Sequence, residues 1–126
     1  MERVLKFRAW YQNLMFPVYE IKFAEKEIFE IAIPDNDGFP HFVDDNIILM
    51  QFTSLLDKNG KEVWEGDILK RTINMRNYAD CDGTAEEIHE VRYERGYWLP
   101  FQDCGYYNLE EFEIIGNIYE GEYAKG

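Results

Sequence analysis

The residues of this 126-residue chain best suited to chemistry are carboxylates that precede a glycine. Residues 35–38 (Asp-Asn-Asp-Gly) resemble half of a calcium loop, in which oxygen ligands alternate ahead of a glycine. With Gly38 at the sixth loop position, Ile33 occupies the first position and cannot ligate, and Pro40 interrupts the loop. Residues 80–83 (Asp-Cys-Asp-Gly) fail similarly, with Tyr78 in the first place. We interpret both segments as solvated turns.

Zinc and nucleophile patterns have less support. His41 and His89 have no His or Cys at ligand spacing, and Cys81 and Cys104 are too far apart for a CxxC motif. Only the fold could bring Cys81, His89 and Cys104 together, and we expect both thiols to be reduced. Gly-rich phosphate loops and the Gly-x-Ser-x-Gly motif are absent from the sequence. We predict a protein that is not an enzyme and has no metal or cofactor.

Aromatic side chains offer a different function, which is binding. Most aromatic residues of a β domain lie in its core, but a partly exposed groove can bind basic or proline-rich peptides. Tyr106 and Tyr107 are adjacent, so in a strand at least one ring must leave the core face. We therefore name Trp98, Tyr106 and Tyr107 as candidate binding residues.

The charge balance limits the class of partner. The chain has 13 Lys+Arg against 25 Asp+Glu, a net charge of −12. Residues 81–126 hold eleven acidic against three basic residues, a balance of −8. Such a surface repels phosphate backbones, so we expect no direct nucleic-acid binding. The charge serves solubility or, alternatively, a basic partner such as a protein that grips nucleic acid.

The elements that position these residues are predicted to be strands, since 17% of the residues are aromatic. Apolar and polar residues alternate over 4–11, over 18–23 and again to Ile33, the period of a half-buried strand. Residues 13–17 are predicted to break the first run. A helix over 18–33 is the rival interpretation, because Glu and Lys are good helix formers.

Turn signals divide the rest of the chain. Residues 34–40 are predicted to form a loop, Asn59-Gly60 a hairpin turn that needs positive φ, and residues 74–86 a long exposed loop. Gly116 predicts a bulge or bend in the last strand. The further predicted strands are 47–52, 68–73, 89–94, 97–99 and 112–119.

Several short strands without an amphipathic helix describe one mainly β domain over residues 1–126, a small barrel or sandwich. Residues 1–46 could form an N-terminal extension on a barrel made by residues 47–120. No apolar run is long enough for a membrane helix, and residues 1–10 have no signal-peptide core. We expect a cytoplasmic protein that does not bind membranes.

Three blocks of the sequence resemble the YopX family of small proteins encoded by bacteriophages and prophages. They are residues 6–10 (Lys-Phe-Arg-Ala-Trp), which end in Trp10, residues 49–68, and residues 114–120 (Ile-Ile-Gly-Asn-Ile-Tyr-Glu). They occur in the family's order and spacing, over about a quarter of the chain. Ser54 stands where the family commonly has Gly, which suggests that positive φ is not required there.

The resemblance implies an SH3-like barrel and a phage origin, in a family whose function is not established. The shared residues look structural: Asn59 and Gly60 set a turn, Gly66 and Asp67 a corner, and Gly116 and Asn117 a bend in the last strand. The Asp67 carboxylate can accept hydrogen bonds from nearby backbone N–H groups.

We therefore expect a non-enzymatic accessory protein of a phage or prophage that binds another protein and associates with itself. Sheet edges must be managed in so small a fold, and symmetric self-association is one solution. The alternative is an acidic decoy that occupies the nucleic-acid site of a DNA-binding protein. A metal-dependent enzyme is a third and weaker hypothesis.

Overall fold

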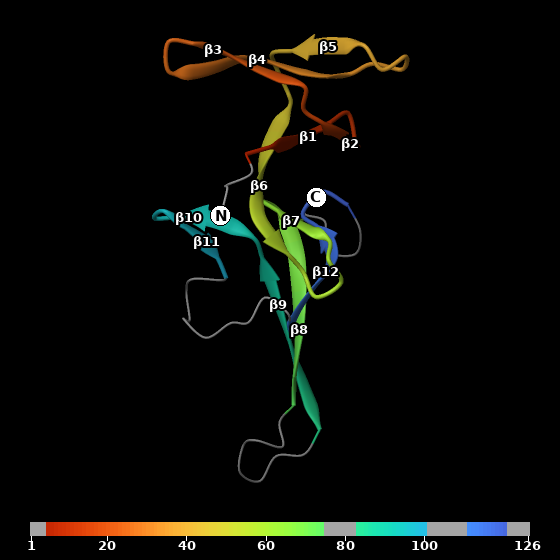
Figure 1. Ribbon diagram of the computed structural model, residues 1–126, viewed down its shortest axis with the longest axis vertical. Coiled ribbons are helices and arrows are strands. Elements are labelled where there is room, and N and C mark those ends of the chain that lie inside the picture. Colours follow the sequence, from red (N-terminus) through yellow and green to blue (C-terminus); the bar gives the residue numbers. More distant parts are fainter. Residues whose placement is uncertain (1–4, 75–82, 101–110, 121–126) are drawn as a thin grey trace. The chain divides into compact units, whose positions relative to one another are not determined.

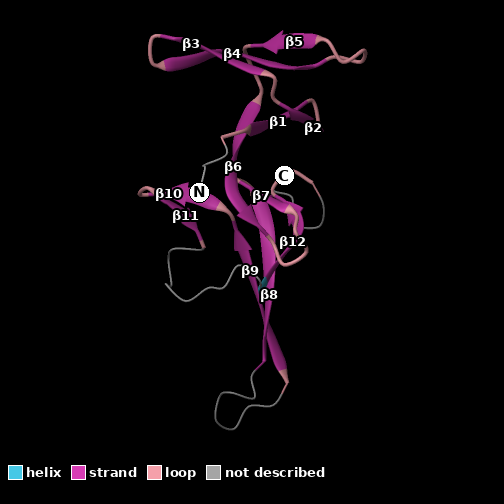
Figure 2. Ribbon diagram, viewed as in Figure 1, coloured by secondary structure: helices cyan, strands magenta, loops and turns pink. Residues whose placement is uncertain are grey.

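The computed structural model describes residues 5–74, 83–100 and 111–120, and most of these residues lie in strands (Figure 2). No α-helix occurs among them, so the mainly β class is confirmed. The strands are β1 (Phe7–Tyr11), β2 (Leu14–Pro17), β3 (Glu20–Ala24), β4 (Glu27–Pro34), β5 (Pro40–Val43), β6 (Ile48–Leu56), β7 (Glu62–Trp64), β8 (Asp67–Asn74), β9 (Thr84–Glu90), β10 (Arg92–Glu94), β11 (Tyr97–Leu99) and β12 (Phe112–Asn117) (Figure 1).

The chain divides into two compact units, residues 1–52 and 53–126. The division falls inside β6, whose first half pairs antiparallel with β1 from Ile48↔Trp10 to Gln51↔Phe7. From Thr53 onward the strand belongs to the second unit. The boundary predicted from the sequence, between residues 46 and 47, lies just ahead of the start of β6.

The first unit builds its core between two small sheets, with strand orders β2-β1-β6 and β3-β4-β5. Alternation places one face of each strand inward, and the fully buried members of the resulting cluster come from β1, β4 and β5. Partly buried residues on β1, β2 and β6 and beside them pack around this cluster. The buried members are Ala9, Ile31, Ile33 and Val43.

Strand β2 lies where the sequence predicted a break. Gln12 and Asn13 have φ values of +50° and +64°, which allow a two-residue turn between Tyr11 and Leu14. Gln rarely adopts positive φ, so this hairpin was not predicted from Gln12-Asn13. Strand β5 is likewise absent from the prediction, because the loop residue Pro40 begins it.

The hairpin of β3 and β4 is confirmed over the rival helix. Glu25 takes a φ of +59° in the turn, and the two strands pair from Glu20↔Ala32 to Ala24↔Glu27. The register shifts between Lys22 and Phe23, which marks a bulge. Strand β5 continues the sheet on the other side of β4, but pairs only with residues 31–34.

The second unit contains a three-stranded sheet of order β12-β8-β9, the hairpin of β10 and β11, and β7 beside the end of β6 (Figure 1). Its core is a separate cluster of Val63, Leu69, Val91 and Phe112. The bulge predicted at Gly116 is confirmed by a register shift between Ile114 and Gly116. Strand β9 begins at Thr84, so the predicted loop over 74–86 is wrong at its end, and residues 75–82 lie outside the described residues.

The expectation that Ser54 avoids positive φ is wrong. Ser54 has a φ of +70° in the middle of β6 and its side chain is exposed. Phe52 and Thr53 are consecutive yet both buried, so the strand's alternation of faces is interrupted beside Ser54. The backbone therefore keeps the left-handed conformation that suits the family's glycine, and Ser54 adopts it against the steric preference of its Cβ.

Replacing Ser54 with Gly removes this steric penalty, and we expect the free energy of unfolding to rise by about 0.5–1 kcal/mol. Urea unfolding followed by tryptophan fluorescence measures the change. Ser54→Ala is the matched control, because it removes the hydroxyl but keeps the Cβ, and it should give no gain. Equal stability of the Gly and Ala variants would contradict the assignment of strain to φ.

Candidate functional site

The polar centre of the second unit is the carboxylate of Asp57, which is only 6% exposed. Its Oδ1 accepts hydrogen bonds from the backbone N–H groups of Asn59 and Lys61, at 2.8 and 2.9 Å. Its Oδ2 accepts from Ile114 N at 3.0 Å, 57 residues further along the chain. One side chain thus shapes the turn between β6 and β7 and attaches that turn to β12.

The turn differs from the predicted one because of Asp57. Gly60 has a φ of +80°, whereas Asn59 is not among the positive-φ residues. Gly60 N donates to Asp57 O at 3.1 Å, and Asp57 N donates to Lys61 O at 2.8 Å. This is a type I turn followed by a left-handed glycine, a three-residue hairpin loop. Asp followed by x-Asn-Gly was the sequence signal that identifies Asp57.

Opposing effects set the pKa of Asp57. Burial by itself would raise the pKa, because it disfavours the charged form. The N–H donors of Ile114, Lys61 and Asn59, aided by the charge of Lys61, outweigh burial and hold the pKa below its ordinary value of 3.8. Asp57 is therefore an ionised structural acceptor at neutral pH.

A second buried carboxylate, Asp67, organises the corner between β7 and β8. Asp67 Oδ2 accepts from Trp64 N at 2.7 Å, and Gly66 reverses the chain with a φ of +89°. The corner also bonds to neighbouring strands: Gly66 N donates to Val91 O, and Ile118 N donates to Gly66 O, both at 2.9 Å. This network connects β8 to the segment between β9 and β10 and to the end of β12.

At the end of β12, Asn117 forms a turn of the same kind. Its Oδ1 accepts from the backbone N–H groups of Tyr119 and Glu120, at 2.8 and 2.7 Å. The bulge at Gly116 precedes it. Thr53 also acts on the backbone, since its Oγ1 donates to Val63 O at 2.7 Å. Each of these side chains forms hydrogen bonds to backbone groups of the fold.

The candidate binding residue Trp98 lies in β11 and is half-buried against the core of the second unit. Tyr93 on β10 is its cross-strand neighbour. The two rings meet edge to face, with centroids 4.9 Å apart and an interplanar angle of 62°. Tyr93 is 54% exposed, so the pair presents an anchored ring beside an accessible one. Sequence reasoning missed Tyr93; its register opposite Trp98 is set by the turn at Arg95-Gly96.

Tyr97 is 55% exposed but lies on the opposite face of the same hairpin, since it neighbours Trp98 in the strand. The other two predicted binding residues, Tyr106 and Tyr107, lie outside the described residues, as do Cys81 and Cys104. Trp10 lies in β1 of the first unit, half-buried, and pairs with Met15 and Ile48.

A charged cluster covers the core beside β8. Arg71 contacts Glu87 at 2.8 Å and Glu111 at 3.2 Å, and its guanidinium lies 5.7 Å from the ring centre of Phe112. His89 Nε2 lies 3.1 Å from the same Glu87 oxygen. Burial would raise the pKa of Glu87, but hydrogen bonds from His89 and Arg71 and their charges lower it. The cluster joins β8, β9 and the start of β12.

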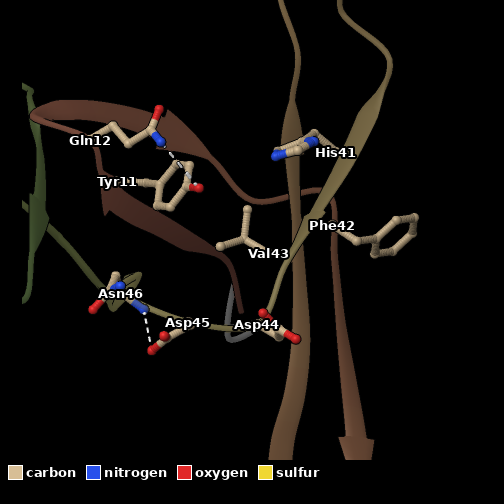
Figure 3. A pocket seen from close by; sticks show the side chains of 8 residues that line it. All are labelled: Tyr11, Gln12, His41, Phe42, Val43, Asp44, Asp45 and Asn46. Carbon is tan, nitrogen blue, oxygen red and sulfur yellow. Dashed lines mark hydrogen bonds between the residues drawn. The ribbon is translucent and has the colours of Figure 1, made fainter.

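The first unit has an open hollow of about 430 Å³, lined by residues 11–12 and 41–46 (Figure 3). Figure 3 shows Val43 pointing toward Tyr11, and Phe42 pointing away on the other side of β5. Tyr11 Oη accepts from Gln12 Nε2 at 3.4 Å, and Asp45 Oδ1 accepts from Asn46 N at 2.9 Å. Its acidic residues are exposed and solvated, so the hollow shows no organised site.

The residues that resembled a calcium loop form a turn. Asp35 Oδ1 accepts from the backbone N–H groups of Asp37 and Phe39, both at 2.9 Å. Across residues 5–74, 83–100 and 111–120, no three or more His, Cys, Asp or Glu side chains gather closely enough to hold a metal ion. The same residues include no helix long and apolar enough to cross a membrane.

Comparison with known proteins places the chain in a family. The profile of a family described as "YopX protein" matches residues 6–122. The chain belongs to the YopX family. This confirms the resemblance carried by the three sequence blocks, two of which contain the Asp57 turn and the Asn117 turn.

A solved structure is also similar to this YopX chain. The crystal structure of protein EF1440 from Enterococcus faecalis matches with a TM-score of 0.57 and 24% sequence identity, over 94% of this chain and 95% of that chain. At this identity the likeness shows the fold alone. Comparison with curated proteins finds no match.

Replacing Asp57 with Ala leaves three backbone donors without their carboxylate, and we expect the free energy of unfolding to fall by about 2–4 kcal/mol. Urea unfolding followed by tryptophan fluorescence measures the change, because two of the three tryptophans, Trp64 and Trp98, lie in the second unit. Asp35→Ala is the control: Asp35 also accepts two backbone N–H groups, but in an exposed turn, so its loss should cost less than about 1 kcal/mol. Similar losses in both variants would contradict the role of Asp57 in attaching the β6–β7 turn to β12.

Stability should also fall at acid pH. The pKa values of Asp57 and Glu87 lie below their ordinary values of 3.8 and 4.5. Each carboxylate therefore stabilises the fold fully above its ordinary pKa, and that contribution is lost as pH falls through the lower, folded value. Urea midpoints measured from neutral pH downward should fall steeply below about pH 4. In Asp57→Asn the urea midpoint should fall less steeply over the same pH range. The same decline in both proteins would exclude Asp57 as its source.

Proposed function

We propose that this YopX protein is a non-enzymatic accessory protein of a phage or prophage, which acts in the host cytoplasm by binding another protein and by associating with itself. The observation that supports protein binding is the pair of Tyr93 and Trp98. A ring anchored on the core beside a more exposed ring gives a rigid aromatic surface, and such surfaces recognise extended peptides.

We assign this surface to an SH3-like barrel formed by the second unit. The three-stranded sheet β12-β8-β9, the hairpin β10–β11 and the turn clamped by Asp57 supply its short strands. In barrels of this kind, aromatic rings form the groove that receives proline-rich segments. With a net charge of −12, the preferred peptide is one in which Lys or Arg flanks the prolines.

The test is a set of synthetic proline-rich peptides with and without flanking basic residues, titrated against the protein with Trp98 fluorescence as one readout. Tyr93→Ala should weaken binding about tenfold or more, since it removes an aromatic contact from the peptide surface. Tyr97→Ala is the matched control, because it removes an equally exposed tyrosine from the opposite face of the hairpin. Absence of binding, or equal losses in the two variants, would contradict this function.

The net charge supports a second candidate, an acidic decoy for a nucleic-acid-binding protein. Eleven acidic residues against three basic ones in 81–126 give the second unit much of the charge that a basic nucleic-acid site would attract. A pull-down from nuclease-treated host lysate at low and high salt separates the two candidates. Capture of a DNA-binding protein that is released by salt and by competing duplex DNA supports the decoy, whereas indifference to both removes it.

A further inference from the structure

Strand β3 is an edge strand, because no other described strand pairs with its outer side. Strand β5 pairs with β4 only at residues 31–34, so the hairpin from Lys22 to Glu30 continues past it as a two-stranded ribbon (Figure 1). A two-stranded ribbon is marginally stable in water unless another strand or layer supports it. The outer edge of β3 also presents backbone N–H and C=O groups that can pair with a further strand.

One face of this ribbon is apolar and only half covered. Near β5, Ile31 lies in the core of the first unit, and Ile21 is its cross-strand neighbour on β3. Toward the hairpin turn the same row continues into residues that are largely exposed. They are Phe23 at 65%, Ile28 at 46% and Phe29 at 56% exposure. Three large apolar side chains therefore lie exposed at the end of one ribbon, next to the open edge of β3.

The opposite face of β3 carries one charge of each sign. Glu20 and Lys22 are two residues apart, so they share a face, and both are exposed. If two β3 strands pair antiparallel about a two-fold axis at Ile21, Glu20 of each copy lies directly opposite Lys22 of the other. The same register sets Ile21 against Ile21, and Tyr19 against Phe23, on the apolar face.

Other registers lack this complementarity. An axis at Lys22 sets two lysines directly opposite each other, which is destabilising. A shift by one residue places apolar side chains of one copy beside the charges of the other. The sequence of β3 therefore matches itself in one antiparallel register, and a two-fold axis satisfies both ion pairs at once.

We propose that β3 binds β3 of a second copy of this chain in that register, so that two molecules share one six-stranded sheet. The new backbone hydrogen bonds cover the edge, and the apolar ribbon ends of the two copies contribute to one continuous face. The proposal rests on the self-association proposed above and specifies its surface. It does not depend on the peptide surface at Tyr93.

The test is a charge swap read by sedimentation equilibrium, in which the dimer has twice the chain mass of 15.1 kDa. Glu20→Lys and Lys22→Glu each place like charges opposite each other twice, and each should raise the dimer dissociation constant about tenfold or more. The double variant E20K/K22E restores both opposite-charge pairs and should restore the dimer. Glu25→Lys, which makes the same change of net charge as Glu20→Lys but in the hairpin turn, should leave the dimer intact.

Circular dichroism and urea midpoints check that each variant is folded, which the exposure of both side chains predicts. A dimer that survives both single swaps overturns the β3 surface while self-association stands. So does a double variant that stays dissociated. A wild-type protein that is monomeric at every concentration overturns self-association and this surface together, and leaves the peptide-binding proposal intact.

Discussion

The second unit depends on the carboxylate of Asp57. Among the described residues, its core cluster has four fully buried side chains. The burial of so few side chains leaves only a small net stability once it has offset the loss of chain entropy. Asp57 compensates by accepting three backbone N–H groups, one of them on β12. The hairpin of β6 and β7 is thereby attached to the strand that ends the described chain. Asp67 and Asn117 likewise accept hydrogen bonds from backbone N–H groups, at the two neighbouring corners. This explains why the family blocks contain these residues.

Side-chain alternation made several strands predictable, because a half-buried strand repeats with period two. The β3–β4 and β10–β11 hairpins follow from it and from Glu25 and Arg95-Gly96 in their turns. A non-glycine residue with positive φ does not prevent prediction when polar residues separate two alternating runs, as at Glu25 and Arg95. Gln12 and Ser54 also adopt positive φ, but β2 lacks the polar-apolar alternation and Ser54 lies inside an apolar run, so neither β2 nor the interruption of β6 was predicted. The turn at Asn59-Gly60 was predicted, but the hydrogen bonds through which Asp57 shapes it are contacts that only the folded chain makes.

The candidate site was predictable in part, for a related reason. Trp98 could be named because the chain has only three tryptophans, but its partner depends on strand register. Tyr93 lies opposite Trp98 and Tyr97 does not, although the sequence alone does not distinguish the two tyrosines. The edge of β3 shows the same limit: Glu20, Ile21 and Lys22 form a common alternating pattern, and only the sheet order reveals that they lie at an open edge. Both proposed surfaces thus depend on strand register and sheet order, which pattern alone does not reveal.

Hydrogen exchange of the wild-type protein at low and high protein concentration tests most directly that the molecule acts through such surfaces. The account predicts that backbone amides of β3 become more protected as concentration rises, while the amides of β10 and β11 exchange at unchanged rates, since the proposed contact involves β3 and not these strands. Exchange in β3 that does not depend on concentration would contradict it.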